Sequence, residues 1–199
     1  MVAGWPQFLK LHWEVLAATD FFTVEVATWH GLVTFYVLVV MELATRRVQI
    51  AGITPHPTGA FMQQCARQLT DPFDGFLLGK RDLLHGRDTK FTQVFDGFLK
   101  ASGVEPVVLP PRSPDLNAHC ERFVRSIKKE ALERMVMLGE GSLYHVIHAY
   151  LTPYHRERNH QGLDNRLMAP EREVGCQTGH VVRRERLGGL RSYDHREAA

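Results

Sequence analysis

The stretch that decides the fold runs from Leu109 to Glu130 and reads L-P-P-R-S-P-D-L-N-A-H-C-E-R-F-V-R-S-I-K-K-E. A proline-rich loop ends at Asn117, and the pattern after it predicts a helix with Glu121 in its first turn. At about 100° per residue, Arg125 and Lys128 fall within roughly 40° of Glu121. This face is either a solvated surface with an i,i+4 ion pair, or a site where the carboxylate binds a metal ion and the cations bind phosphates.

Two other segments carry acids. Asp20 interrupts the apolar run L-A-A-T-D-F-F-T-V-E-V, and Asp88 lies in L-L-H-G-R-D-T-K-F, just after a predicted strand end. Each acid also has a purely structural interpretation. Asp20 can be an exposed side chain of an edge strand, and Asp88 can pair with Arg87 or Lys90 in a turn.

The order of these acids, with one on an early strand, one after a later strand and a glutamate on a following helix, resembles the retroviral-type integrase core. The same core is found in transposases of bacterial insertion sequences. The resemblance covers roughly residues 5–170 and rests also on S-P-D-L-N-A-H-C-E-R-F and on Y-H-R-E-R-N-H-Q-G-L at residues 154–163. It implies a ribonuclease-H-like fold and metal-dependent DNA strand transfer.

The chain departs from the family pattern in the middle segment. Aligned on Phe91, the position of the family's middle acid is occupied by Gly86. Asp88 is a possible substitute, because residues 86 and 88 of an extended chain point to the same side, about 6–7 Å apart. The resemblance implies that Asp20, Asp88 and Glu121 act in catalysis and bind Mg²⁺ or Mn²⁺, with binding weakened by Gly86.

Contacts to DNA are expected from the residues around the helix start, because arginine, lysine and asparagine side chains bind phosphate oxygens. The predicted DNA-binding residues are Arg112, Asn117, Arg125 and Lys128. The proline-rich loop can equally be a rigid turn alone. In the later run, Arg158, His160 and Gln161 either contact phosphates or cap the core helices. The net charge of +2 does not by itself indicate nucleic-acid binding, and DNA binding is expected because basic residues are clustered.

Apolar spacing and turn residues predict an α/β fold, a five-stranded mixed sheet flanked by helices. The strands are expected at residues 16–26, 32–40, 46–53, within 75–85 with an end near 83–84, and at 105–109. The helices are expected at 59–70, 91–101, 118–137 and 142–154. Residues 1–15 form a lead-in, as a short helix or an extended segment, and 16–170 form the core. Residues 171–199 form a small basic tail, with a strand pair within 175–186 and a turn at 187–190.

Several classes are disfavoured. Three cysteines without a C-x-x-C pair argue against a disulfide framework, and His145 and His148 lack the partners of a zinc site. The most apolar window, residues 31–41, is far shorter than the roughly 20 residues of a membrane helix, and no signal peptide is visible. A bacterial cytoplasmic protein without a membrane partner is expected.

The function expected is that of a transposase or integrase catalytic core that joins DNA ends as a homo-oligomer, either active or inactivated by the loss of one carboxylate. A non-catalytic DNA-binding remnant of such an enzyme is the main alternative, and Gly86 supports it. A ribonuclease-H-type nuclease acting on hybrids is a third. No DNA-binding module is apparent before residue 16, so recognition of DNA ends is expected from a separate or lost domain.

Overall fold

The computed structural model describes residues 5–110, 117–156, 180–186, 189 and 191–196. The chain divides into two compact units. The first contains residues 1–24 and 34–123, and the second contains residues 25–33 and 124–199. Each unit is described by itself below.

A mixed sheet organises the fold. Its first three strands follow one another along the chain as β1 (Leu16–Thr28), β2 (Gly31–Glu42) and β3 (Val48–Thr54), with β2 and β3 antiparallel. The strand order is β3-β2-β1-β4-β5, where β4 (Asp82–His85) is parallel to β1 and β5 (Glu105–Val108) is parallel to β4. The predicted meander and mixed sheet are therefore confirmed, with one strand more than the five expected, because residues 137–138 also pair with β1.

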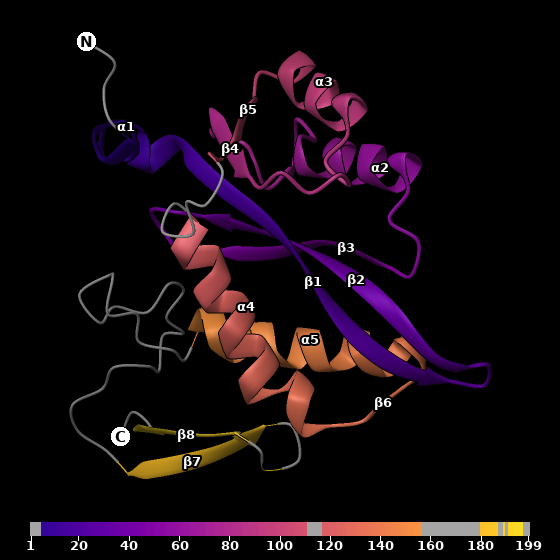
Figure 1. The fold of residues 1–199 in the computed structure, drawn as a ribbon. Helices are drawn as coiled ribbons and strands as arrows, with labels where there is room; N and C mark the ends of the chain where they lie inside the picture. The colour runs from indigo at the N-terminus through magenta and orange to yellow at the C-terminus, as the bar shows by residue number, and fades with distance from the viewer. Residues whose placement is uncertain (1–4, 111–116, 157–179, 187–188, 190, 197–199) are drawn as a thin grey trace. The chain divides into compact units, whose positions relative to one another are not determined.

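Two helices cover one face of this sheet in the first unit, α2 (Gly59–Leu69) and α3 (Gln93–Ala101) (Figure 1). Each begins at a threonine whose side chain accepts a backbone N–H of the first turn: Thr58 accepts from Phe61 and Thr92 accepts from Phe95. Such N-caps satisfy donors that the helix itself leaves unpaired. The two helix starts are thus fixed by local sequence.

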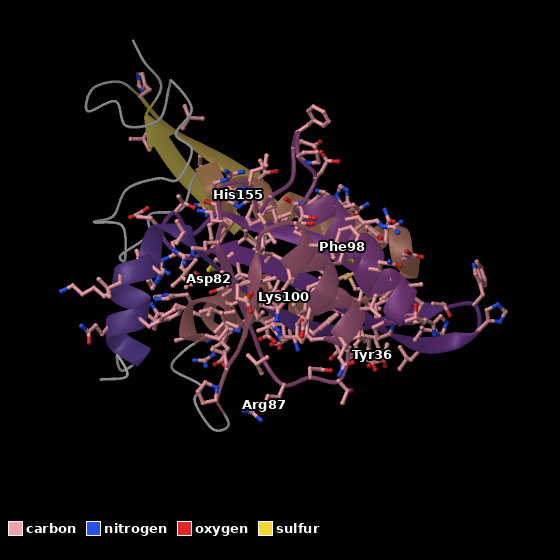
Figure 2. The ribbon with its side chains drawn as sticks, turned by 90° about the horizontal axis from the view of Figure 1, so that it is seen from above. Tyr36, Asp82, Arg87, Phe98, Lys100 and His155 are labelled. Carbon is pink, nitrogen blue, oxygen red and sulfur yellow. The ribbon has the colours of Figure 1, made fainter. Side chains whose placement is uncertain are left out.

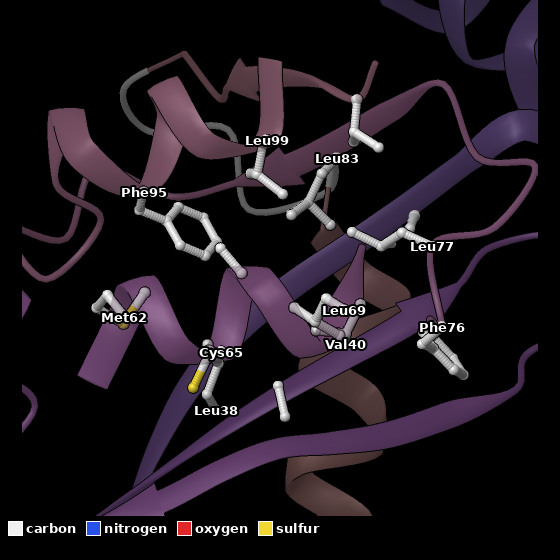
Figure 3. Packing of buried hydrophobic residues seen from close by; sticks show 14 residues of the cluster. Leu38, Val40, Met62, Cys65, Leu69, Phe76, Leu77, Leu83, Phe95 and Leu99 are labelled. Atoms are coloured by element: carbon white, nitrogen blue, oxygen red, sulfur yellow. The ribbon is translucent and has the colours of Figure 1, made fainter. Parts of the chain in front are cut away.

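The core of the first unit lies between the sheet and these helices (Figure 3). Its fully buried side chains include Leu38, Met62, Leu83, Phe95 and Leu99. The apolar run of β2 is long because this strand is buried along most of its length, as central strands are. Gly52 on β3 admits the ring of Phe61, since a Cβ there would lie only 2.6 Å from that ring.

The fourth strand, expected within residues 75–85, is found there and occupies only the end of that segment. Only residues 82–85 form β4, and residues 71–80 form turns. Asp71 starts the turns by accepting the backbone N–H of Phe73, at 2.9 Å, and Gly75 N–H donates to the Asp71 carbonyl. A local side-chain bond of this kind competes with strand pairing.

The helix that follows Asn117, α4 (Ala118–Glu130), ends earlier than the predicted residue 137. A short 3₁₀ turn, Leu132–Arg134, follows it, and β6 (Met137–Leu138) then pairs with the far end of β1, Met137 opposite Val26. This non-local pairing draws the chain out of the helix. The strand β6 was not predicted.

In the second unit, α5 (Gly139–Arg156) buries Leu143, Ile147 and Tyr150. The Tyr150 hydroxyl donates to a Glu130 carboxylate oxygen at 3.3 Å. The strands β7 (Val181–Arg186) and β8 (Arg191–Arg196) form an antiparallel hairpin, later in the chain than the predicted pair within 175–186. The boundary at residue 170 stays a prediction.

The lead-in contains a helix, α1 (Trp5–His12), followed by a 3₁₀ turn, Trp13–Val15. This decides between the helical and extended alternatives for that segment. Among the helices within the described ranges, each is too short or too polar to cross a lipid bilayer.

Candidate active site

The register of the parallel strands brings Asp20 beside residue 86. In β1 and β4, Leu16 pairs with Asp82 and Ala18 pairs with Leu84. Continued by two residues, to just past the end of β4 at His85, this register would bring Gly86 level with Asp20, at the strand spacing of about 4.8 Å. Because side chains alternate between faces, both positions belong to the face opposite the one that carries the core residue Leu83.

Gly86 is required by neither the backbone nor the packing. Its φ is not positive, so an ordinary residue can adopt its conformation. A Cβ built at this position would meet no heavy atom within 4 Å. Position 86 therefore has room for the Cβ of a larger residue, and the continued register would set that residue beside Asp20.

The pKa of Asp20 is raised. Burial raises the pKa of its carboxyl, and the charges of Glu121 and Asp88 raise that pKa further. One contact acts in the opposite direction, because Asp20 Oδ1 accepts the N–H of Phe21 at 2.8 Å. Asp88 and Glu121 therefore each lie within electrostatic reach of Asp20. Glu121 itself is half-buried in the first turn of α4.

Asp88 is held by Lys90. The Lys90 ammonium lies 2.7 Å from Asp88 Oδ2 and 2.9 Å from Oδ1, and the Lys90 backbone N–H donates to Oδ1 at 3.0 Å. Burial acts to raise the pKa of Asp88, yet these bonds to Lys90 hold it below its ordinary value. The ammonium also lies over the rings of Phe21 and Tyr36, at 5.4 and 5.0 Å from their centroids. The structural interpretation of Asp88, a pair with Lys90, is the one that the contacts bear out.

The segment around Gly86 is anchored on both sides. Arg87, labelled in Figure 2, donates from Nε to the Leu109 carbonyl at the end of β5, at 3.1 Å. His85 is only 2% exposed, and its Nδ1 lies 2.8 Å from the Gly86 carbonyl oxygen while its Nε2 lies 3.4 Å from Asp96. His85 was not among the predicted site residues, although its place directly before Gly86 pointed to a position near the site.

The residues predicted to contact DNA differ in their exposure to solvent. Arg125 is exposed on α4, and neither Arg125 nor Glu121 forms an ion pair with any residue that the structure describes. Lys128 is partly exposed on the same helix. Asn117 is buried instead, at 6% exposure, which argues against the predicted DNA contact. Arg112 lies outside the described residues, as do the 158, 160 and 161 positions of the later run.

A second group of side chains near the start of α4 was also missed. His119 meets the ring of Trp13 edge-on at 5.7 Å, and the Arg46 guanidinium lies over the same ring at 5.2 Å. Burial lowers the pKa of His119 to about 4, and the charges of Arg46 and Arg122 act in the same direction. His119 is therefore neutral at ordinary pH. No motif in the sequence linked these three distant positions.

The acidic side chains near Asp20 are candidate ligands for a divalent metal ion. Within the described ranges, no three or more His, Cys, Asp or Glu side chains are grouped closely enough to hold a metal ion together. Asp20 and Glu121 supply two hard carboxylate donors, which suit Mg²⁺ when water completes its shell. The residues thus fit a two-carboxylate site for one ion, and they do not fit the three-carboxylate arrangement.

Comparison with known proteins gives the same fold. The integrase core domain family matches residues 102–167. The catalytic core domain of BIV integrase is similar with a TM-score of 0.52 and 18% identity, over 75% of this chain and 88% of that one. The HTLV-2 integrase catalytic core domain, described in complex with magnesium and in a dimeric form, has a TM-score of 0.58 and 13% identity, over 78% and 93% of the two chains. No curated protein matches.

At these identities the solved structures show the fold alone, and the family match shows a sequence similarity over the segment that contains Glu121. Together they confirm the resemblance and the ribonuclease-H-like fold that it implied. This chain has the fold of integrase catalytic core domains, and its residues 102–167 match the integrase core domain family.

Proposed function

We propose that this chain is a transposase- or integrase-type core that acts on DNA ends, with a metal site that lacks one carboxylate. The observation that supports the proposal is the register of β1 and β4, which would bring Gly86 level with Asp20 if continued by two residues, together with the charge of Glu121, which raises the pKa of Asp20. In this proposal, the two acids and the position that lacks its expected carboxylate lie together at one edge of the sheet.

Asp20 and Glu121 would hold one divalent ion, and Mg²⁺ is the ion proposed. A bound ion would supply positive charge for the phosphate oxygens of a DNA strand. The raised pKa of Asp20 supports this role, because a cation would relieve the repulsion that Glu121 and Asp88 impose. The chain's own contribution is to keep both carboxylates close and, through the bond from Phe21 N–H, to orient Asp20.

DNA is the proposed partner. Arg125 and Lys128 follow Glu121 on α4, and the exposed guanidinium of Arg125 has no ion pair with a described residue. Basic side chains of this kind bind phosphates without reading sequence. A homo-oligomer is proposed as well, by analogy with the dimeric form described for the HTLV-2 core.

We propose that strand transfer by the unmodified chain is weak or absent. Asp88 cannot readily replace a ligand at position 86, because both of its oxygens are bound to the Lys90 ammonium. Loss of one member of a catalytic unit can lower a rate by several orders of magnitude. The alternative function, a DNA-binding remnant without catalysis, is favoured by this same contact.

A strand-transfer assay with supplied DNA ends and Mg²⁺ separates the two functions. Three chains are compared, the unmodified one, Gly86→Asp and the neutral control Gly86→Asn. The catalytic proposal expects joining by Gly86→Asp and almost none by the other two. If all three bind DNA and none joins it, the remnant is the better description. Efficient joining by the unmodified chain that is lost in Asp88→Asn would make Asp88 the third acid.

A further inference from the structure

Asn117 occupies the junction between α4 and β1. It lies one helical turn before Glu121, and residues four apart on a helix are neighbours on one face, with Cβ atoms about 5–6 Å apart. Its side chain is buried at 6% exposure, although its neighbours Ala118 and His119 are only partly buried. The burial indicates that this amide faces the interior of the first unit.

The amide of Asn117 contacts the strand beside Asp20. Its Nδ2 donates to the carbonyl oxygen of Thr19 at 3.4 Å, and Thr19 directly precedes Asp20. Thr19 is itself immobilised, because it is fully buried and its hydroxyl donates to the Val39 carbonyl of β2 at 2.7 Å. Asn117 therefore links the first turn of α4 to a rigid part of the sheet, one residue from Asp20.

Stability alone does not explain an asparagine at this position. Its Oδ1 is buried and has no hydrogen-bond partner among the described residues. A buried acceptor without a partner is unfavourable, and a leucine of similar size would carry no such acceptor. This amide therefore lowers the folding stability at its position, which lies next to the two acids that the proposed function requires.

We propose that Asn117 is a positioning residue that sets the separation of the Asp20 and Glu121 carboxylates by anchoring α4 to Thr19. This inference rests on the proposed function, because it concerns the same two acids. Groups that orient metal ligands without touching the metal are known to affect affinity strongly. Asn117 acts in this way through the backbone of its own helix, four residues before Glu121.

The test measures Mg²⁺ binding by calorimetry for the unmodified chain and for Asn117→Leu, with circular dichroism to confirm folding. Loss of an orienting group weakens metal binding by about 10–100-fold, which is the loss expected for Asn117→Leu. Ala118→Gly is the matched control, because it weakens the start of the same helix while leaving the amide in place. Its Mg²⁺ affinity should stay within about twofold of the original, since the anchor of this helix is kept.

A second readout uses no metal. Hydrogen exchange of the amides in the second turn of α4, residues 122–125, which donate within the helix, should be faster in Asn117→Leu than in Ala118→Gly, because only the former loses the anchor to Thr19. Equal exchange in the two variants would overturn the proposal, and so would unchanged Mg²⁺ affinity in a folded Asn117→Leu. If the unmodified chain binds no Mg²⁺, the proposed metal site fails by itself, and the exchange comparison still decides for or against the anchor.

Discussion

Replacing Gly86 by aspartate should destabilise the chain without metal and make its stability depend on Mg²⁺. The new carboxylate would lie beside Asp20, in space that is open at present. With the two carboxylates turned apart to roughly 6 Å, an effective dielectric constant near 20 gives a repulsion of about 3 kcal/mol. Replacing a glycine whose backbone is not strained recovers about 0.4–1 kcal/mol by restricting the unfolded chain.

The net expectation is a loss of about 2 kcal/mol at pH 8, where both carboxylates are ionised. Mg²⁺ should reverse much of it. For a dissociation constant of about 1 mM and about 10 mM Mg²⁺, linkage gives a gain of about 1.4 kcal/mol. The neutral variant Gly86→Asn should not be destabilised, and Mg²⁺ should stabilise it no more than it stabilises the unmodified chain, because it adds the same bulk without the charge.

Urea unfolding measures this directly, in a chelator and in Mg²⁺, for the unmodified chain and both variants. The slope of the unfolding free energy against urea should be the same for all three, so that midpoints can be compared. If Gly86→Asp and Gly86→Asn are equally stable in the chelator, residue 86 is not beside Asp20, and the register argument fails. If the aspartate variant is destabilised but Mg²⁺ restores nothing, the acids are close without forming a metal site.

Three further predictions concern the same site. Asp20→Asn should be more stable than the unmodified chain in metal-free buffer at pH 8. The folded pKa of Asp20 is raised, so its ionisation destabilises the fold as pH rises through that pKa. The difference between the two unfolding midpoints should therefore vanish at pH 3. Lys90→Gln should cost at most about 1 kcal/mol, because its pair with Asp88 is partly exposed. It should also tighten Mg²⁺ binding in calorimetry, and unchanged affinity would leave Asp88 out of the site. The double change Arg125→Ala and Lys128→Ala should reduce the slope of log K for DNA against log salt by about 1.8 for duplex DNA, as titrations at several salt concentrations would measure, and an unaltered slope would place DNA elsewhere.

Local patterns predicted the parts of the fold that local physics determines. The apolar runs of β1, β2 and β3 are separated by short turns, so a meander was the simplest arrangement, and it is the one observed. The start of α4 after Asn117 was equally clear, because a proline-rich loop precedes it. The strand β6 could not be predicted, since two residues carry no periodicity and it exists only through its pairing with Val26 and Ala27.

The candidate site shows the same division. The positions of Asp20 and Glu121 came from a family pattern, and the pairing of Asp88 with Lys90 was one of the alternatives that short spacing offers. The burial of Asn117 was beyond the reach of the sequence, because its contact with Thr19 joins residues that lie far apart along the chain. An asparagine after a proline-rich loop suggests a surface residue, and only the packing of α4 against β1 reverses that expectation.

The open space around Gly86 has a consequence at the level of the gene. Every glycine codon becomes a codon for aspartate or glutamate through a single G-to-A change at its second base. Because a Cβ at position 86 would meet no heavy atom within 4 Å, such a change would encounter no steric barrier at that atom. A population of cells that carries this gene is therefore one transition mutation away from a chain with an acid at that position, and silencing by Gly86 would be readily reversible in evolution.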